Sequence, residues 1–159
     1  MAGLLPTQGG TVLEVGGRVD GTLALEKRGW RAVAVDANAV LAQGAFGGEA
    51  VDAVTCWLLE PPSGSGVAAE KLQAMGLRTA DEARLALQTL VYRLADRVLR
   101  DGGVLQVVDR FPEALDEARS TGIVRLQRAQ SRGTSLEFAS MDARPHAGGA
   151  LVSVRSRKA

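Results

Sequence analysis

The stretch that decides the fold is TVLEVGGRVDGTLALEKRGWRAVAVD, residues 11–36. Its first five residues, 11–15, are mostly β-branched or apolar and run into a glycine pair, which is typical of a strand that enters a tight turn. Residues 20–28 have helical spacing, and residues 32–35 form a second apolar strand. A β-α-β unit this short makes a right-handed parallel crossover, so we expect the glycine turn and Asp36 at the same edge of the sheet.

This edge has the chemistry of a site for a nucleotide-like ligand. The helix that follows Gly21 offers free N–H groups, and Gly16 and Gly17 allow a ligand to approach the backbone closely. The spacing Gly16-x-Arg18-x-x-Gly21 is a dinucleotide-type glycine pattern with arginine at the middle position, and Asp36 lies close to the offset expected for a ribose-binding carboxylate. A purely structural strand-to-helix turn is the alternative interpretation.

Three segments of the chain carry a resemblance to one enzyme family. LEVGG and VAVD, with Glu14 two residues before the first glycine, resemble motifs I and II of the class I S-adenosylmethionine (SAM)-dependent methyltransferases. Residues 51–59 resemble the fourth motif of that family, and residues 94–110, LADRVLRDGGVLQVVDR, resemble its helix, turn and fifth strand. The resemblance implies SAM as the cofactor, held by Glu14, Gly16, Gly17, Gly21, Asp36, Ala37, Cys56 and Trp57.

The expected fold is α/β, a Rossmann-like three-layer sandwich in one domain that spans residues 1–159. The sheet should be mostly parallel and should end in an antiparallel hairpin, as in the family. The segment between Asp36 and residue 51 is long enough for one crossover helix only, so the third strand of the family is expected to be missing.

The remaining elements are predicted from periodicity and punctuation. Helices are expected over 67–75 and from a capping box at 79–82 up to Asp101, followed by a strand over 104–109. A further helix is expected over 112–120, stopped at Gly122. Strands are then predicted over residues 123–127, 135–141 and 150–154.

Composition excludes several classes of function. The net charge of +1 and a pI near 7.9 give no field that would attract nucleic acid, so nucleic acid is not expected as a partner. Cys56 is the single cysteine and His146 the single histidine, so neither an internal disulfide nor a cysteine or histidine metal site is expected. The sequence has no signal peptide and no membrane-spanning run, which predicts a cytoplasmic protein.

Methyl transfer from a sulfonium needs mainly alignment of donor and acceptor and exclusion of water, and a base only for a poor nucleophile. Glu60 follows the strand of residues 51–59 and is the candidate base, with a solvated loop carboxylate as the alternative. Trp57 either stacks on adenine or substrate or belongs to the core. Asp109 and Arg110 either orient a substrate or form a local surface pair.

Two hypotheses about function follow. The first is SAM-dependent methyl transfer to a small-molecule or protein acceptor. The second is a non-catalytic methyltransferase-fold scaffold or regulatory subunit, motivated by Arg18 in the glycine turn and by the missing strand. Residues 1–10 are too few for substrate-covering helices, so a lid is expected to be missing or to come from a partner subunit or a second copy. If SAM binds, Arg18 should point away from the positively charged sulfonium.

Overall fold

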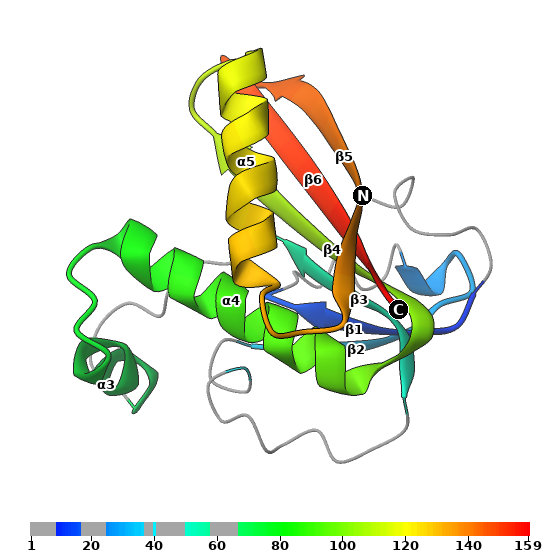
Figure 1. Cartoon of the computed structure of the whole chain (residues 1–159). Helices are drawn as coiled ribbons and strands as arrows, with labels where there is room; N and C mark the ends of the chain where they lie inside the picture. The colour runs from blue at the N-terminus through cyan, green and yellow to red at the C-terminus, as the bar shows by residue number, and fades with distance from the viewer. Residues whose placement is uncertain (1–8, 17–24, 37–39, 41–49, 58–66) are drawn as a thin grey trace.

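The structure, a computed structural model, describes residues 9–16, 25–36, 40, 50–57 and 67–159 (Figure 1). Its strands are β1 (Thr11–Val15), β2 (Arg31–Val35), β3 (Val51–Trp57), β4 (Leu99–Phe111), β5 (Leu136–His146) and β6 (Gly149–Lys158). Its helices are α3 (Val67–Ala74), α4 (Ala80–Val98) and α5 (Glu117–Gln130).

The described strands form one sheet in the order β2-β1-β3-β4-β6-β5. The first four strands of this order are parallel, and β6 and β5 run antiparallel to their neighbours. The predicted α/β fold with a C-terminal antiparallel hairpin is therefore confirmed. Within the described residues β2 has no outer neighbour. The segment in which the third strand of the family was expected to be missing lies, for residues 37–39 and 41–49, outside the described residues.

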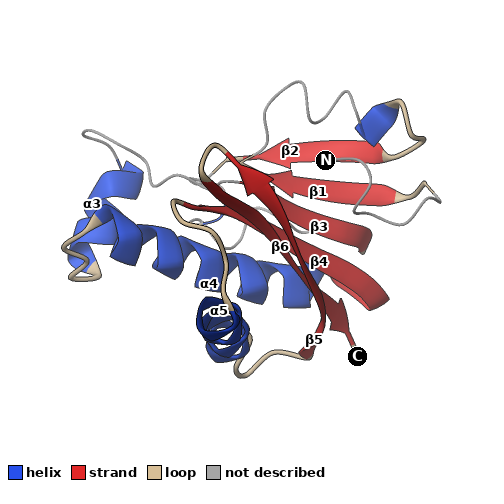
Figure 2. Cartoon of the chain, turned by 90° about the horizontal axis from the view of Figure 1, so that it is seen from above, coloured by secondary structure: helices blue, strands red, loops and turns tan. Residues whose placement is uncertain are grey.

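The two faces of the sheet bury different side chains. Helices α4 and α5 lie on one face (Figure 2), where α4 covers a core that includes Val15, Val54 and Leu105. On the other face a smaller cluster joins Leu25 and Trp30, from the β1–β2 connection, to strand residues Val12 and Ala53. Side chains in a strand alternate between faces, so β1 and β3 each contribute buried residues to both clusters.

Helix α4 forms where the sequence predicts it. The Thr79 side chain accepts from the Glu82 backbone N–H at 3.1 Å, and a Glu82 carboxylate oxygen accepts from the Thr79 N–H at 3.0 Å. This capping box satisfies donors that the first helical turn leaves open. Leu87, Val91 and Leu94 recur at helical spacing and are buried against the sheet. No helix in the described ranges is long and apolar enough to cross a membrane.

The prediction for residues 112–127 was wrong at two points. Asp116 caps α5 by accepting from the Arg119 backbone N–H at 2.8 Å, so the helix begins at Glu117 and not near Pro112. The helix then continues through Gly122 to Gln130, where a strand over 123–127 was expected. Ile123, Gln127 and Gln130 are spaced by four and three residues and are all buried, so packing offsets the helix cost of Gly122.

The boundaries of the last strands also differ from the prediction. The segment from Leu99 to Gly103 is part of β4, with Leu99 in register with Val51 across a bulge, whereas a helix end and a turn were expected there. The hairpin of β5 and β6 is confirmed, but both strands are longer than predicted and turn at Ala147 and Gly148. The strands are longer because residues of β5 and β6 pair with each other, and this pairing cannot be predicted from the local sequence pattern.

Candidate functional site

The carboxyl edge of the parallel strands brings together three of the predicted site residues. Val15 pairs in register with Val35 of β2 and with Cys56 of β3, so Gly16, Asp36 and Trp57 lie level at the ends of three adjacent strands. Ligands of open α/β sheets bind at this edge.

Gly16 makes the turn that leaves β1. Its φ is 68°, a left-handed conformation that favours glycine, and its N–H donates to the Val35 carbonyl oxygen at 2.9 Å. The bond fixes Gly16 beside the end of β2, where the Asp36 carboxylate is exposed. A glycine turn and a carboxylate on neighbouring strand ends are what a ribose-containing ligand requires.

Glu14 lies one strand residue before this edge and is fully buried. Leu13 and Val15 pack towards α4, so strand alternation places the Glu14 side chain on the opposite face of the sheet. Its register partner Thr55 and the next residue across, Gln106, are also buried and polar. A row of polar side chains therefore crosses the sheet on the face away from α4.

Several atoms of this face have no hydrogen-bond partner among the described residues. They are Thr55 Oγ1, Trp57 Nε1 and Arg155 Nε, and all are shielded from solvent. Gln106, by contrast, donates from Nε2 to Ser153 Oγ at 3.0 Å. Buried polar atoms without partners are rare and mark a bound water or ligand, or a functional role. Trp57 Nε1 is the one of the three that lies at the carboxyl edge.

Cys56 occupies a different environment from its neighbour Trp57. Its side chain is 1% exposed and belongs to the core beneath α4. Burial raises the pKa of the Cys56 thiol from 9.0 to about 12, so the thiol stays protonated at neutral pH and is a poor nucleophile. Its predicted contact with the cofactor stays a prediction.

Four of the predicted site residues lie outside the described residues: Gly17, Gly21, Ala37 and the candidate base Glu60. Arg18 lies outside them as well, so its expected outward orientation stays a prediction.

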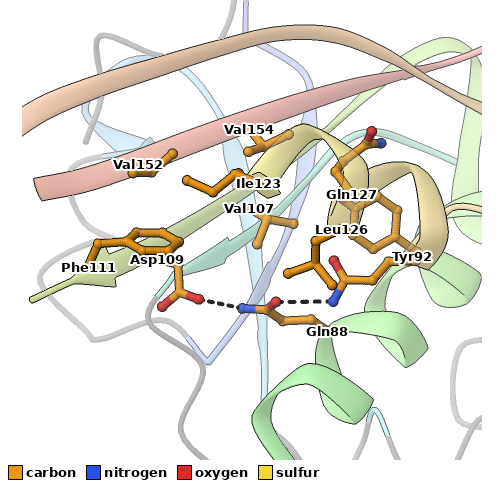
Figure 3. A pocket seen from close by; sticks show the side chains of 11 residues that line it. Gln88, Tyr92, Val107, Asp109, Phe111, Ile123, Leu126, Gln127, Val152 and Val154 are labelled. Atoms are coloured by element: carbon orange, nitrogen blue, oxygen red, sulfur yellow. Dashed lines mark hydrogen bonds between the residues drawn. The ribbon is translucent and has the colours of Figure 1, made fainter. Parts of the chain in front are cut away.

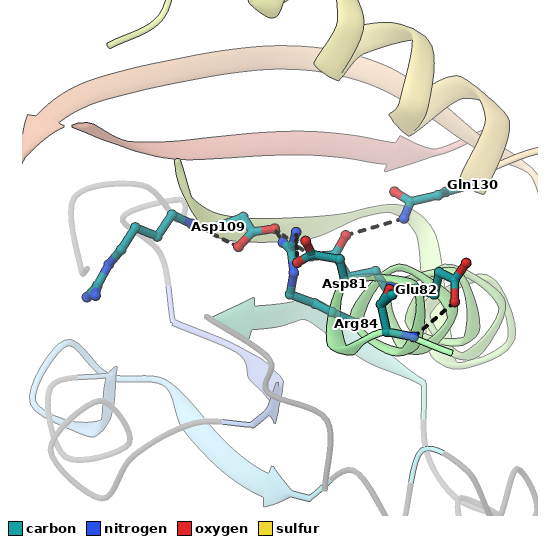
Figure 4. Close-up of polar contacts among 8 residues, drawn as sticks. Asp81, Glu82, Arg84, Asp109 and Gln130 are labelled. Atoms are coloured by element: carbon teal, nitrogen blue, oxygen red, sulfur yellow. Dashed lines mark hydrogen bonds and ion pairs between the residues drawn. The ribbon is translucent and has the colours of Figure 1, made fainter. Parts of the chain in front are cut away.

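A second polar cluster, which sequence analysis did not identify, joins α4 to the carboxyl end of β4. Asp109 accepts from Gln88 Nε2 at 2.9 Å and forms an ion pair with Arg84 (Figure 4). Gln130 of α5 donates to Gln88 Oε1 at 3.3 Å. Asp109 thus turns towards α4, and Arg110 contacts it through its backbone N–H. The signal in the sequence was the four-residue spacing of Arg84 and Gln88 on one helix face.

A small cavity of about 30 Å³ lies between α4, α5 and the sheet, next to this cluster (Figure 3). Gln127 donates from Nε2 to Ser156 Oγ at 2.8 Å beside it, and the Gln127 Oε1 has no partner within the described ranges. Burial raises the pKa of Tyr92 to about 12, although hydrogen bonds with Ser156 and Gln127 act in the opposite direction. The volume would fit one or two water molecules and is too small for a cofactor.

Several solved structures have a fold similar to that of this chain. A putative hemolysin from Streptococcus thermophilus superposes with a TM-score of 0.62 at 10% identity over 99% of this chain. A 16S rRNA (adenine(1408)-N(1))-methyltransferase from Catenulisporales acidiphilia, solved with SAM, superposes at 0.57 with 15% identity over 94% of this chain and 84% of that one. A putative sarcosine dimethylglycine methyltransferase from Galdieria sulphuraria superposes at 0.52 with 13% identity over 94% of this chain and 78% of that one.

The chain spans 62% of the length of the streptococcal protein. No protein-family model matches the sequence, and no curated protein matches it. At 10–15% identity these likenesses concern the fold alone. The chain therefore has the Rossmann-like fold that SAM-dependent methyltransferases share.

Proposed function

We propose that the chain binds SAM at the carboxyl edge of β1, β2 and β3 and transfers its methyl group to a small-molecule or protein acceptor. One observation carries the proposal: Gly16, in a left-handed turn bonded to Val35, lies level with the exposed Asp36 on the adjacent strand. The likeness in fold to a methyltransferase solved with SAM supports the same choice of ligand.

The described residues fit such a cofactor. Gly16 has no side chain to obstruct a ligand, and the Asp36 carboxylate is suited to accept hydrogen bonds from two ribose hydroxyls. Trp57 Nε1 is a buried donor that has no protein acceptor in the described part of the chain, so it is suited to a ligand acceptor at the same edge. Glu14, the predicted ligand of the amino-acid end of SAM, is fully buried two residues before Gly16.

SAM, when bound, supplies an electrophilic methyl group on a sulfonium. The protein's part is to hold donor and acceptor in line and to exclude water, which converts a bimolecular step into an effectively unimolecular one. Asp36 would hold the ribose, the Gly16 turn would hold the amino-acid end, and Trp57 would close one side of the site. Glu60, the predicted base, would be needed only for an acceptor with a proton to lose.

Calorimetric titration with SAM and with its demethylated product tests the proposal. The wild type should bind both, and Asp36→Ala should weaken binding by roughly ten- to a hundredfold, because hydrogen bonds to a charged acceptor contribute about 1.5–3 kcal/mol. Glu137→Ala is the matched control, since it removes an exposed carboxylate from the opposite edge strand, β5. Absence of binding heat at millimolar ligand would reject SAM as the ligand.

The alternative, a non-catalytic scaffold or regulatory subunit with the same fold, is favoured by one observation. The side chain of Val33 in the edge strand β2 is 39% exposed, which suits pairing with another chain. A radiolabelled methyl-transfer assay with acceptor mixtures separates the two functions. SAM binding with methyl transfer supports the enzyme, whereas a stable complex without SAM binding supports the scaffold.

A further inference from the structure

The sheet has an exposed edge at β2. Strand β1 is its one neighbour among the described strands, and β2 ends the fan of strands in Figure 2. Val33 is 39% exposed and Ala34 is exposed as well, so their side chains lack the cover that strands at the sheet centre have. An exposed apolar edge is a template for pairing with another strand.

The opposite edge of the same sheet is protected against such pairing. Strand β5 carries Asp142, Arg144 and Pro145, and its pairing with β6 is interrupted by a bulge between Phe138 and Ser140. Charges, proline and bulges are the devices by which proteins block edge-to-edge association. The interior of β2, residues 32–34, has none of these devices.

The backbone of β2 shows which groups face outward. Arg31 donates its N–H to the Gly10 carbonyl at 2.8 Å, and the Val35 carbonyl accepts from Gly16 at 2.9 Å. Residues 31, 33 and 35 therefore direct their backbone groups to β1. By strand alternation, the N–H and C=O groups of Ala32 and Ala34 point away from the sheet.

We propose that β2 pairs antiparallel with β2 of a second copy of this chain, about a two-fold axis at Val33. In this register Ala32 lies opposite the partner's Ala34, and each of the two such pairs exchanges two N–H···O bonds. Val33 lies opposite the partner's Val33 in the close, non-hydrogen-bonded position, with Cα atoms about 4.5 Å apart. The two six-stranded sheets become one continuous sheet.

The charges at the ends of β2 fit a second copy in this orientation. Arg31 begins the strand and Asp36 directly follows it, so the strand is positive at one end and negative at the other. Antiparallel pairing sets each Arg31 near the end that carries the partner's Asp36, whereas parallel pairing would bring like charges together. Pairing in this register also overlaps all five residues of the strand.

Five paired residues bury less area than the roughly 1,200–2,000 Å² of a stable protein interface. The dimer should therefore be reversible, with a mass that depends on concentration. The inference does not depend on SAM binding, so its outcome and that of the proposed function can be read separately.

Light scattering coupled to size exclusion over a dilution series tests the pairing. The wild type should move from 16.6 kDa towards twice that mass as its concentration rises. Val33→Lys and Val33→Asp should each remain monomeric. In a dimer of either variant, the two-fold axis would place the introduced charge directly opposite the same charge of the partner. An equimolar mixture of the two variants should regain the dimer, since the introduced ammonium group of one copy then faces the introduced carboxylate of the other.

Leu126→Lys on α5 is the matched control, because Leu126 is 38% exposed, and it should leave the mass series unchanged. A wild type whose mass stays at 16.6 kDa at its highest soluble concentration overturns the proposal. Pairing of β2 with a different protein would not restore it. Single variants that dimerise as the wild type does, or a mixture that stays monomeric, would also overturn it. A dimer in the mixture would also show that both variants fold.

Discussion

Gln88 donates a hydrogen bond from Nε2 to Asp109 across 2.9 Å, and this bond joins α4 to the carboxyl end of β4. Gln88 is 4% exposed, so its replacement leaves the Asp109 carboxylate short of a donor in a partly buried place. We expect Gln88→Ala to lower the free energy of unfolding by about 1–3 kcal/mol. Urea denaturation gives this value, and Arg93→Ala on the exposed face of the same helix should change it little.

A double-mutant cycle with Asp109→Ala isolates the bond itself. If the two side chains act together, the loss in the double variant will be smaller than the sum of the single losses, with a coupling of about 0.5–3 kcal/mol. Strict additivity would show that the contact contributes nothing to stability.

Two glycines should respond in opposite directions to replacement by alanine. Gly122 lies within α5, and a Cβ there would meet no atom within 4 Å, so Gly122→Ala should stabilise the protein by about 0.5–1 kcal/mol. A Cβ at Gly149 would overlap the Phe111 carbonyl oxygen, so Gly149→Ala should destabilise it by about 1–3 kcal/mol. Thermal unfolding compares the two, and destabilisation by Gly122→Ala would argue against a continuous α5.

Stability should fall in alkaline solution. The pKa of Cys56 rises from 9.0 to about 12 on folding and that of Tyr92 from 10.0 to about 12, both chiefly through burial. Above pH 9 the unfolded chain releases protons that the folded chain retains, so the stabilisation present below pH 9 is lost as the pH approaches 12. Urea midpoints across this range measure the loss.

Cys56→Ala separates the two groups. This variant lacks the thiol, so its decline in stability should begin nearer pH 10, where unfolded Tyr92 ionises. Stability that does not change between pH 9 and pH 12 would contradict the burial of both groups.

Trp57→Phe tests the buried donor at the carboxyl edge. The phenyl ring keeps part of the packing but removes Nε1, which makes no hydrogen bond to the described residues. The variant should keep most of its stability yet bind SAM up to about tenfold more weakly, the loss expected for one neutral hydrogen bond. Trp30 directly precedes β2, far from the carboxyl edge, and is buried in the core. Trp30→Phe should therefore lower the free energy of unfolding and leave the affinity for SAM unchanged. Equal effects of both variants on affinity would remove Trp57 from the site.

Local interactions explain what could be predicted from the sequence. The capping box at Thr79 and Glu82 and the apolar spacing of α4 are interactions within one helix, and they are confirmed. The strand, glycine and strand pattern of residues 11–36 likewise led to Gly16 and Asp36 at one edge, because a short parallel crossover has one sterically allowed hand.

Tertiary structure decided the rest, because contacts between distant residues leave no local pattern. Gly122 was predicted to end a helix. Helix α5 nevertheless continues through it, because Ile123 and Gln127 are buried against β6 and its neighbours. Asp109 was predicted either to orient a substrate or to form a local surface pair with Arg110, yet Arg84 and Gln88, more than twenty residues earlier, bind it. Cys56 and Trp57 are adjacent in sequence, but strand alternation sends the thiol into the core beneath α4 and the indole to the opposite face.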